Sequence, residues 1–133
     1  MTTIVQISDT HFGTEQPAVV QAMEDHVSEH GADLLIYSGD ITQRARAGQF
    51  AAAQAFVQRL HGHGIADTLV IPGNHDIPLY NVFARFLMPY RNYRRHFGDD
   101  LEPTFENDEV LIIGLNTTHP RRHKDGRVTD EQV

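Results

Sequence analysis

The stretch Leu34-Leu35-Ile36-Tyr37-Ser38-Gly39-Asp40 decides the fold class of this chain. Its first four residues form a continuous apolar run of strand length, which is typical of a strand covered on both faces. The run stops at a serine, a glycine and an aspartate, so polar groups follow the strand directly. The stretch therefore predicts a buried strand that delivers a carboxylate to one edge of a sheet.

The same arrangement occurs once before and once after this stretch. Ile4–Ser8 alternates as a short strand does and leads into Asp9-Thr10-His11. Thr68–Ile71 is a third apolar run and stops at Pro72-Gly73-Asn74-His75-Asp76. Each of the three predicted strands therefore ends in a polar cluster.

Apolar residues at helical spacing predict two helices between these strands, over about 17–30 and 47–60. Strands that alternate with helices of this length predict a parallel sheet with right-handed crossovers. Farther along the chain, 80–96 is predicted to be helical with an interruption at Pro89, and 110–115 to be a fourth buried strand. We therefore expect an α/β fold in which a parallel or mixed sheet is flanked by helices.

Composition limits the function classes. The chain has 133 residues, 9 histidines, no cysteine and a formal net charge of −7. The lack of cysteine excludes disulfides, thiolate zinc sites and cysteine nucleophiles, and the acidic balance argues against general nucleic-acid binding. No apolar run approaches the ~20 residues that span a bilayer, and the start lacks a basic leader. We expect a cytoplasmic protein with no membrane partner.

The three polar clusters predict a metal centre. The carboxyl ends of parallel strands lie along one edge, where open α/β folds build their sites. Two carboxylates, imidazole and a carboxamide meeting there are ligands that suit divalent Mn, Fe or Zn. Each cluster alone is also an ordinary turn or helix cap. Their joint occurrence, one after each strand, favours the metal site.

The series Asp9-Thr10-His11, Gly39-Asp40 and Gly73-Asn74-His75-Asp76 resembles the motif series of the calcineurin-like metallophosphoesterases. Within that family the chain is most similar to the bacterial branch of cyclic-nucleotide phosphodiesterases, which also contains glycerophosphodiesterases. The resemblance implies a metal-dependent hydrolase for a small phosphodiester of one of these two classes. It also implies the first half of a four-layer α/β/β/α sandwich.

The resemblance assigns roles to individual residues. Asp9 and His11 would bind a first metal ion, Asp40 would bridge two ions, and Asn74 would bind the second. The two divalent ions would acidify a bridging water, so that a hydroxide attacks phosphorus. His75 would be catalytic, either by stabilising charge on the phosphoryl group or by protonating the departing alkoxide.

The later motifs of that family, a lone histidine and Gly-His-x-His, have no counterpart in this chain. His61-Gly62-His63-Gly64 ends a helix before the third motif, and His119 is not expected to be a ligand. Thr129-Asp130-Glu131-Gln132 has the spacing of a capping box, which predicts the start of a helix. We therefore expect residues 1–133 to be one incomplete domain, the amino-terminal half, without the remaining metal-binding histidines and inactive alone.

Two other functions stay open at this point. One is a non-catalytic scaffold on the same fold. The chain keeps every residue of the first three motifs, and a scaffold has no physical need for these charged ligands, which argues against this function. The other is the all-helical HD phosphohydrolase class, because His75-Asp76 resembles the His-Asp doublet of that class. In that class the doublet lies on a helix, whereas here a predicted strand and Pro72-Gly73 precede it. The sequence predicts neither the substrate nor the oligomeric state.

Loops that follow the strands are the natural place for substrate selection. Ile77–Tyr80 is one candidate segment, and two basic clusters are others. We interpret the basic clusters as solvated faces, because runs of charge usually are. The clusters are Arg91, Arg94 and Arg95, and Arg121, Arg122 and Lys124.

Overall fold

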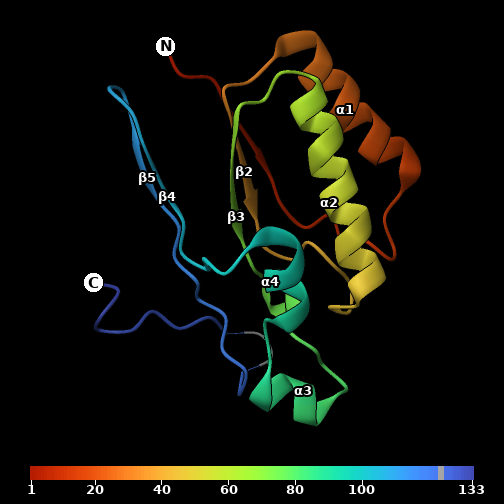
Figure 1. Ribbon diagram of the computed structural model, residues 1–133, viewed down its shortest axis with the longest axis vertical. Coiled ribbons are helices and arrows are strands. Elements are labelled where there is room, and N and C mark those ends of the chain that lie inside the picture. The colour runs from red at the N-terminus through yellow and green to blue at the C-terminus, as the bar shows by residue number, and fades with distance from the viewer. Residues whose placement is uncertain (123–124) are drawn as a thin grey trace.

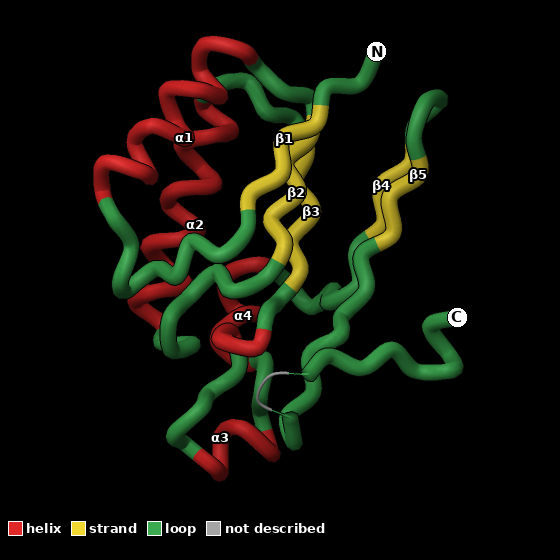
Figure 2. Tube along the Cα trace, turned by 180° about the vertical axis from the view of Figure 1, so that it is seen from behind, coloured by secondary structure: helices red, strands yellow, loops and turns green. Residues whose placement is uncertain are grey.

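A parallel sheet lies between a pair of long helices and a separate two-stranded ribbon. The computed structural model describes residues 1–122 and 125–133. Figures 1 and 2 show the same arrangement from opposite sides, with the helices on one side of the sheet and the ribbon on the other. This confirms the expected α/β class with helices packed against a parallel sheet.

The sheet contains β1 (Ile4–Ile7), β2 (Leu34–Ser38) and β3 (Asp67–Ile71) in that order, all parallel. In the register, Val5 pairs with Leu35 on the neighbouring strand. Because both connections return to the same end of the sheet, the three carboxyl ends lie along one edge. The parallel pairing predicted from the strand and helix order is confirmed.

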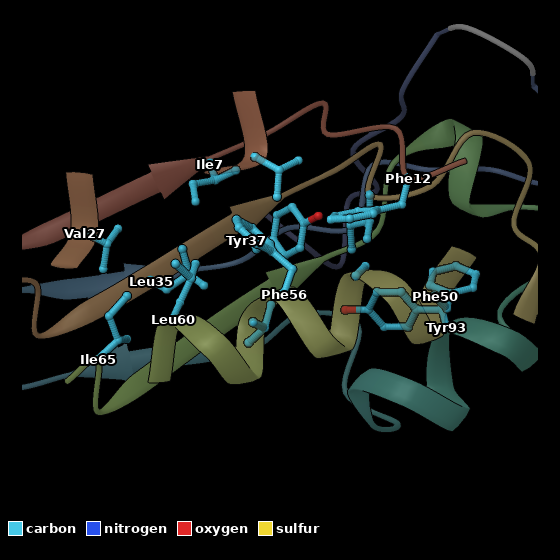
Figure 3. Packing of buried hydrophobic residues seen from close by; sticks show 14 of the residues in the cluster. Ile7, Phe12, Val27, Leu35, Tyr37, Phe50, Phe56, Leu60, Ile65 and Tyr93 are labelled. Carbon is cyan, nitrogen blue, oxygen red and sulfur yellow. The ribbon is translucent and has the colours of Figure 1, made fainter. Parts of the chain in front are cut away.

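Helices α1 (Pro17–His30) and α2 (Ala47–Gly62) cover one face of this sheet. Pro17 starts α1, where its missing N–H is not needed, and Gly31 ends the helix with its N–H donating to the Val27 carbonyl. Apolar side chains of both helices meet those of β2 in a single core (Figure 3). Its largest fully buried members are Tyr37, Tyr93, Phe50, Phe56, Leu35, Ile41 and Leu60.

Short helices follow β3. A single 3₁₀ turn, η1 (Asn74–Asp76), comes first, and α3 (Val82–Leu87) and α4 (Arg91–Phe97) follow. The predicted helix over 80–96 is therefore two helices with Pro89 between them, as the ring of proline requires. Among the described helices, none is both long enough and apolar enough to cross a bilayer.

The prediction of a fourth buried strand is wrong. The apolar run over 110–115 contains β5 (Leu111–Ile113), which pairs antiparallel with β4 (Thr104–Glu106) in a local hairpin. Leu111 is 59% exposed and Ile113 is 61% exposed. The run pairs with a short hairpin strand and not with the central sheet, so it cannot be buried on both faces. The sequence does not predict this hairpin partner.

The predicted capping box at the end of the chain is present in part. The side chain of Gln132 accepts a hydrogen bond of 2.7 Å from the backbone N–H of Thr129. This is the reciprocal half of such a box, in which the third helical residue bonds back to the cap.

Candidate metal centre

Backbone hydrogen bonds hold the loops after the three strands together. Asp9 N donates to Gly39 O at 3.1 Å, and His11 N donates to Asp40 O at 3.0 Å. On the other side of β2, Gly39 N donates to Ile71 O at 2.8 Å. These bonds continue the parallel ladder past the strand ends, so the three polar clusters lie in one set of neighbouring loops.

Three of the predicted ligands have a strained backbone. Asp9, His11 and Asp40 have φ angles of 55°, 45° and 47°. Residues with a Cβ seldom occupy this left-handed region, and each such residue costs about 1–3 kcal/mol unless its surroundings enforce it. Strain of this kind concentrates at functional sites. Here it turns successive polar side chains toward the same edge.

The glycine before Asn74 permits a close approach of two loops. A Cβ at Gly73 would lie 2.1 Å from the backbone nitrogen of Asp40 and 2.2 Å from its Oδ1. No side chain fits at that separation. Glycine at this position therefore lets the third loop pack directly against the Asp40 carboxylate.

His11 faces two carboxylates across a gap. Its Nε2 lies 4.0 Å from Asp9 Oδ1 and 3.9 Å from Asp40 Oδ2. These separations are too long for hydrogen bonds. One ion with bonds of about 2.0–2.2 Å can join two ligand atoms as far apart as this. His11 can therefore share an ion with either carboxylate, but among the described residues the group of ligand atoms within 4.8 Å of one another contains Asp40 and not Asp9.

His75 lies on the other side of the Asp40 carboxylate. Its backbone N–H donates to Asp40 Oδ1 at 3.0 Å, and its ring stands edge-on to that of His11, with centroids 4.8 Å apart. Its Nδ1 is 3.0 Å from the carbonyl oxygen of Gln43, so Nδ1 donates and Nε2 is the nitrogen left for chemistry. One ligand atom from each of His11, Asp40 and His75 lies within 4.8 Å of the others.

The other ring nitrogen of His11 has an unusual environment. Its Nδ1 is buried, and of the side-chain polar atoms in the described part of the chain it alone is buried without a hydrogen-bond partner. Buried polar atoms are nearly always paired with protein, water or an ion. An ion bound at Nε2 would leave this nitrogen unpaired, whereas a ligating histidine normally donates its other ring N–H to a partner. The support for a ligand role therefore comes from Nε2, which faces the two carboxylates.

Asn74 approaches the centre from the third strand. It lines a cavity of about 320 Å³ together with Asp9 and Asp40. Asp9 and His11 line a second cavity of about 480 Å³. Asp9, whose side chain is 67% exposed, therefore borders both cavities, while Asp40 is only 18% exposed between them.

Comparison with known proteins agrees with this site. A family model described as calcineurin-like phosphoesterase matches residues 2–123. The chain belongs to the calcineurin-like phosphoesterase family. No curated protein matches the chain at a significant level. Membership in this phosphoesterase family implies metal-dependent hydrolysis of phosphoesters as the general activity, and the grouping of His11, Asp40 and His75 is consistent with divalent-metal dependence.

Asp76 has a structural role beside the metal centre. The residue is 1% exposed and its carboxylate accepts bonds from the backbone N–H groups of Ile41, Thr42 and Gly73 and from the Thr42 hydroxyl. Burial raises the pKa of Asp76 to about 6, against the lowering effect of these donors. Asp76 therefore joins the loops after β2 and β3, and we find no contact of its carboxylate with the ligand group.

The histidines that resemble the missing motifs are engaged elsewhere. His61 Nε2 lies 2.7 Å from the Thr68 hydroxyl, away from the metal centre. His119 Nδ1 accepts a bond of 3.1 Å from Arg121 N, and the residue lines a different cavity. Neither histidine joins the ligand group among the described residues.

Some groups at the phosphoesterase site were missed by the sequence analysis. Asp125 and Arg122 line the same cavity as Asp40 and Asn74, although both are far from the motifs in sequence. The Gln43 carbonyl, which orients His75, is a backbone group with no sequence signature. From the sequence, Arg122 is predicted only to be part of a solvated basic cluster. Lys124 of that cluster lies outside the described residues.

Proposed function

We propose that this site hydrolyses phosphodiesters with two divalent metal ions, held by Asp9, His11, Asp40 and Asn74. The observation that carries the proposal is the position of Asp40. Its Oδ2 faces His11 on one side at 3.9 Å, and on the other side it shares a cavity with Asn74. A carboxylate with ligand residues on both sides is suited to bridge two ions.

The nitrogen and oxygen donors of this set suit Mn, Fe or Zn. Two such ions supply an acidified water and neutralise charge that develops on the phosphoryl oxygens. The chain's own residues contribute the alignment of these groups. The strained loops and the Gly73 approach hold the ligands before any substrate arrives, so little reorganisation is needed.

His75 is proposed as the catalytic residue. Its Nδ1–H bond to the Gln43 carbonyl fixes the ring. When the imidazole carries both protons, Nε2–H can donate to a phosphoryl oxygen or to the departing alkoxide. The same position beside His11 and Asp40 also suits a ligand. Metal content and rate, measured separately, distinguish these two roles.

The proposed substrate is a small phosphodiester of the cyclic-nucleotide or glycerophosphodiester class, in the cytoplasm. The motif series supports this choice, as the variants Ser8-Asp9-Thr10-His11 and Pro72–Asp76 are most similar to that branch. Arg122 on the cavity wall offers a cation to an anionic or hydroxyl-bearing leaving group. A monoesterase would be the alternative outcome of the substrate test.

We also propose that residues 1–133 form only part of the active domain. Leu111, Ile113 and Leu115 lie on one exposed side of the ribbon at 59%, 61% and 39% exposure. A further sheet layer would cover this side, as the four-layer sandwich requires. The chain alone is therefore expected to bind metal weakly and to show negligible turnover.

Manganese titration tests the proposal. We expect the chain to bind Mn²⁺ weakly at high metal concentration, detected by electron paramagnetic resonance as loss of the free-ion signal, and Asp40→Ala to abolish that binding. Asp108→Ala, an exposed carboxylate on the ribbon, is the matched control and should bind Mn²⁺ as the parent does. Unchanged Mn²⁺ binding by Asp40→Ala would remove the bridging ligand from the proposal. In an active preparation, bis(p-nitrophenyl) phosphate and p-nitrophenyl phosphate then separate diesterase from monoesterase activity.

A further inference from the structure

A short segment after the metal centre exposes many large apolar side chains. We call this surface the apolar tip. Soluble proteins seldom expose contiguous apolar patches of more than a few hundred Å², and those that do usually have a partner. The apolar tip consists of Leu79 (40% exposed), Tyr80 (73%), Val82 (64%), Phe83 (68%), Phe86 (51%), Leu87 (63%) and Met88 (41%).

The apolar tip projects at one end of the molecule. Figures 1 and 2 both show α3 at the end of the long axis, beyond α4 and away from the central sheet. None of the apolar tip residues belongs to the hydrophobic core cluster. Burial ends just before the tip, at Ile77, which is 1% exposed. The tip is therefore a projecting surface and not a displaced part of the core.

Arg85 holds the apolar tip in place. Its side chain is inside the tip, with the residue 3% exposed, and it donates to the carbonyls of Pro78 at 3.1 Å and Arg122 at 2.8 Å and also to that of Pro120. These bonds tie α3 to a segment about 35 residues later in the chain. The exposure of the tip is thus a property of the folded structure, and its apolar side chains are already arranged for contact.

The segment that carries the apolar tip is basic. The segment 77–98 contains four arginines and no Asp or Glu, in a chain whose formal net charge is −7. Arg85 is buried, and Arg94 lies 4.0 Å from the carboxylate of Asp99, which follows the segment. Arg91 and Arg95 are therefore the exposed arginines of the segment without such an ion pair among the described residues. The guanidinium of Arg44 lies over the Tyr80 ring, 4.7 Å from its centroid. Arg121 and Arg122, both exposed, follow the carbonyl of Pro120 that Arg85 binds. The surface that would meet a partner is therefore apolar at its centre and basic at its margin.

We propose that the apolar tip inserts into the interface of a lipid bilayer that carries anionic headgroups. Phe, Tyr and Leu side chains enter the boundary between headgroups and acyl chains, while arginines at the margin meet lipid phosphates. A projecting tip suits a bilayer surface better than the pocketed surface of a protein partner. The expectation of no membrane partner was based on the lack of a spanning run, which does not bear on a short exposed tip.

A second exposed apolar surface, among the residues that the structure describes, lacks this charge pattern. Leu111, Ile113 and Leu115 on the ribbon are about as exposed, but the neighbouring stretch 102–109 carries only acidic charges. Anionic lipid would repel that side. The ribbon therefore provides a control surface of similar exposure and opposite charge.

Docking at the apolar tip would bring the metal centre near the membrane surface. Tyr80 lies under Arg44, the neighbour of Gln43, whose carbonyl accepts from His75. On its other side the tip is tied through Arg85 to Arg122, which lines the cavity of Asp40 and Asn74. The inference concerns lipid binding alone and does not depend on the proposed diesterase activity.

Vesicle co-sedimentation tests the inference. We expect the chain to sediment with vesicles of phosphatidylcholine and phosphatidylglycerol, and at least tenfold less with phosphatidylcholine alone, with added salt weakening the binding. Phe83→Ser with Phe86→Ser should reduce binding to the anionic vesicles by roughly tenfold. Leu111→Ser with Ile113→Ser, the matched control, should bind as the parent does. Circular dichroism of both double variants should match that of the parent, because all four side chains are exposed.

Three results would overturn the inference. One is no sedimentation of the folded parent with either vesicle, and another is equal loss of binding in both double variants. The third is a parent that is dimeric by light scattering and becomes monomeric in Phe83→Ser with Phe86→Ser, since the apolar tip would then cover a second copy of the chain.

Discussion

Oδ1 of Asp76 accepts two hydrogen bonds from Thr42, one from its backbone N–H and one from its hydroxyl, both of 2.8 Å. The other carboxylate oxygen accepts from Ile41 N at 3.1 Å and Gly73 N at 2.8 Å. One buried side chain thus fixes the loop that carries Asp40 against the loop that carries Asn74. The ligand positions depend on this contact, although Asp76 itself binds no ligand atom among the described residues.

Asp76→Ala should destabilise the fold strongly. It leaves three backbone N–H groups and the Thr42 hydroxyl without their acceptor, and each buried unpaired donor costs about 1–3 kcal/mol. We expect the free energy of unfolding to fall by about 3 kcal/mol or more in urea. Asp108→Ala, at an exposed position, should change it by less than about 0.5 kcal/mol. A comparable small change for both would show that the loops do not need this carboxylate.

Gly73→Ala should weaken metal binding more than it weakens the fold. The new Cβ would fall about 2 Å from the Asp40 backbone nitrogen and Oδ1, so the two loops must separate. We expect calorimetric Mn²⁺ affinity to drop at least tenfold while helix content is kept. Gly48→Ala is the matched control, because no atom lies within 4 Å of its Cβ position in α2. Equal metal affinities in the two variants would contradict the close approach.

His75→Ala and Asp40→Ala should have different effects on metal content and catalytic rate. In an active preparation, His75→Ala should lower the rate by about 10²–10⁴-fold with metal content nearly intact, because a positioned acid or donor contributes that much. Asp40→Ala should lose metal and activity together. An alkyl ester should be affected by His75→Ala more than an ester with an acidic phenol, which needs little protonation. Metal loss in His75→Ala equal to that in Asp40→Ala would assign His75 to the coordination shell.

Alkaline pH should unfold the protein through its buried tyrosines. Tyr93 is 1% exposed and donates to the Val70 carbonyl at 2.7 Å, and burial raises its pKa above the usual range. The folded pKa exceeds the unfolded value of about 10, so the stabilisation is complete below pH ~10 and is lost as pH rises beyond it. Urea unfolding between about pH 8 and 11 measures this loss.

Tyr93→Phe is the matched variant for that pH dependence. It should cost about 1 kcal/mol near neutral pH, where the hydrogen bond is lost, yet lose less stability above pH ~10 than the parent. Tyr37, whose pKa burial also raises, should account for the remaining alkaline loss. Parallel pH profiles for the parent and Tyr93→Phe would contradict this assignment.

Local patterns predicted the first part of the fold well. Leu34–Tyr37 and Thr68–Ile71 are apolar runs closed by glycine and a polar residue, so strand and turn are both encoded within a few neighbours. Pro17 and Gly31 likewise mark the ends of α1 by their backbone chemistry. The order of these elements then required parallel pairing, and with it the meeting of three strand ends.

The same reasoning was wrong for residues 110–115, because a short apolar run has the same appearance in a buried strand and in an exposed hairpin. Burial there depends on which partner the strand finds, which in this chain is the three-residue β4. The exposure of the apolar tip was missed for a related reason. Helical spacing over 80–96 predicts helices but does not say whether another element covers them.

The sequence by itself determined which residues stand at the strand ends, because residue type and turn chemistry act between neighbours. It therefore identified Asp9, His11, Asp40 and Asn74 as candidate ligands, and His75 as a residue of the same edge. Only the tertiary structure decided the distances among them, the bond from His75 to Gln43, and the presence of Arg122 and Asp125 at the cavity. Those features join segments far apart in the chain, and side-chain direction there follows from strand register and loop packing that no local pattern contains.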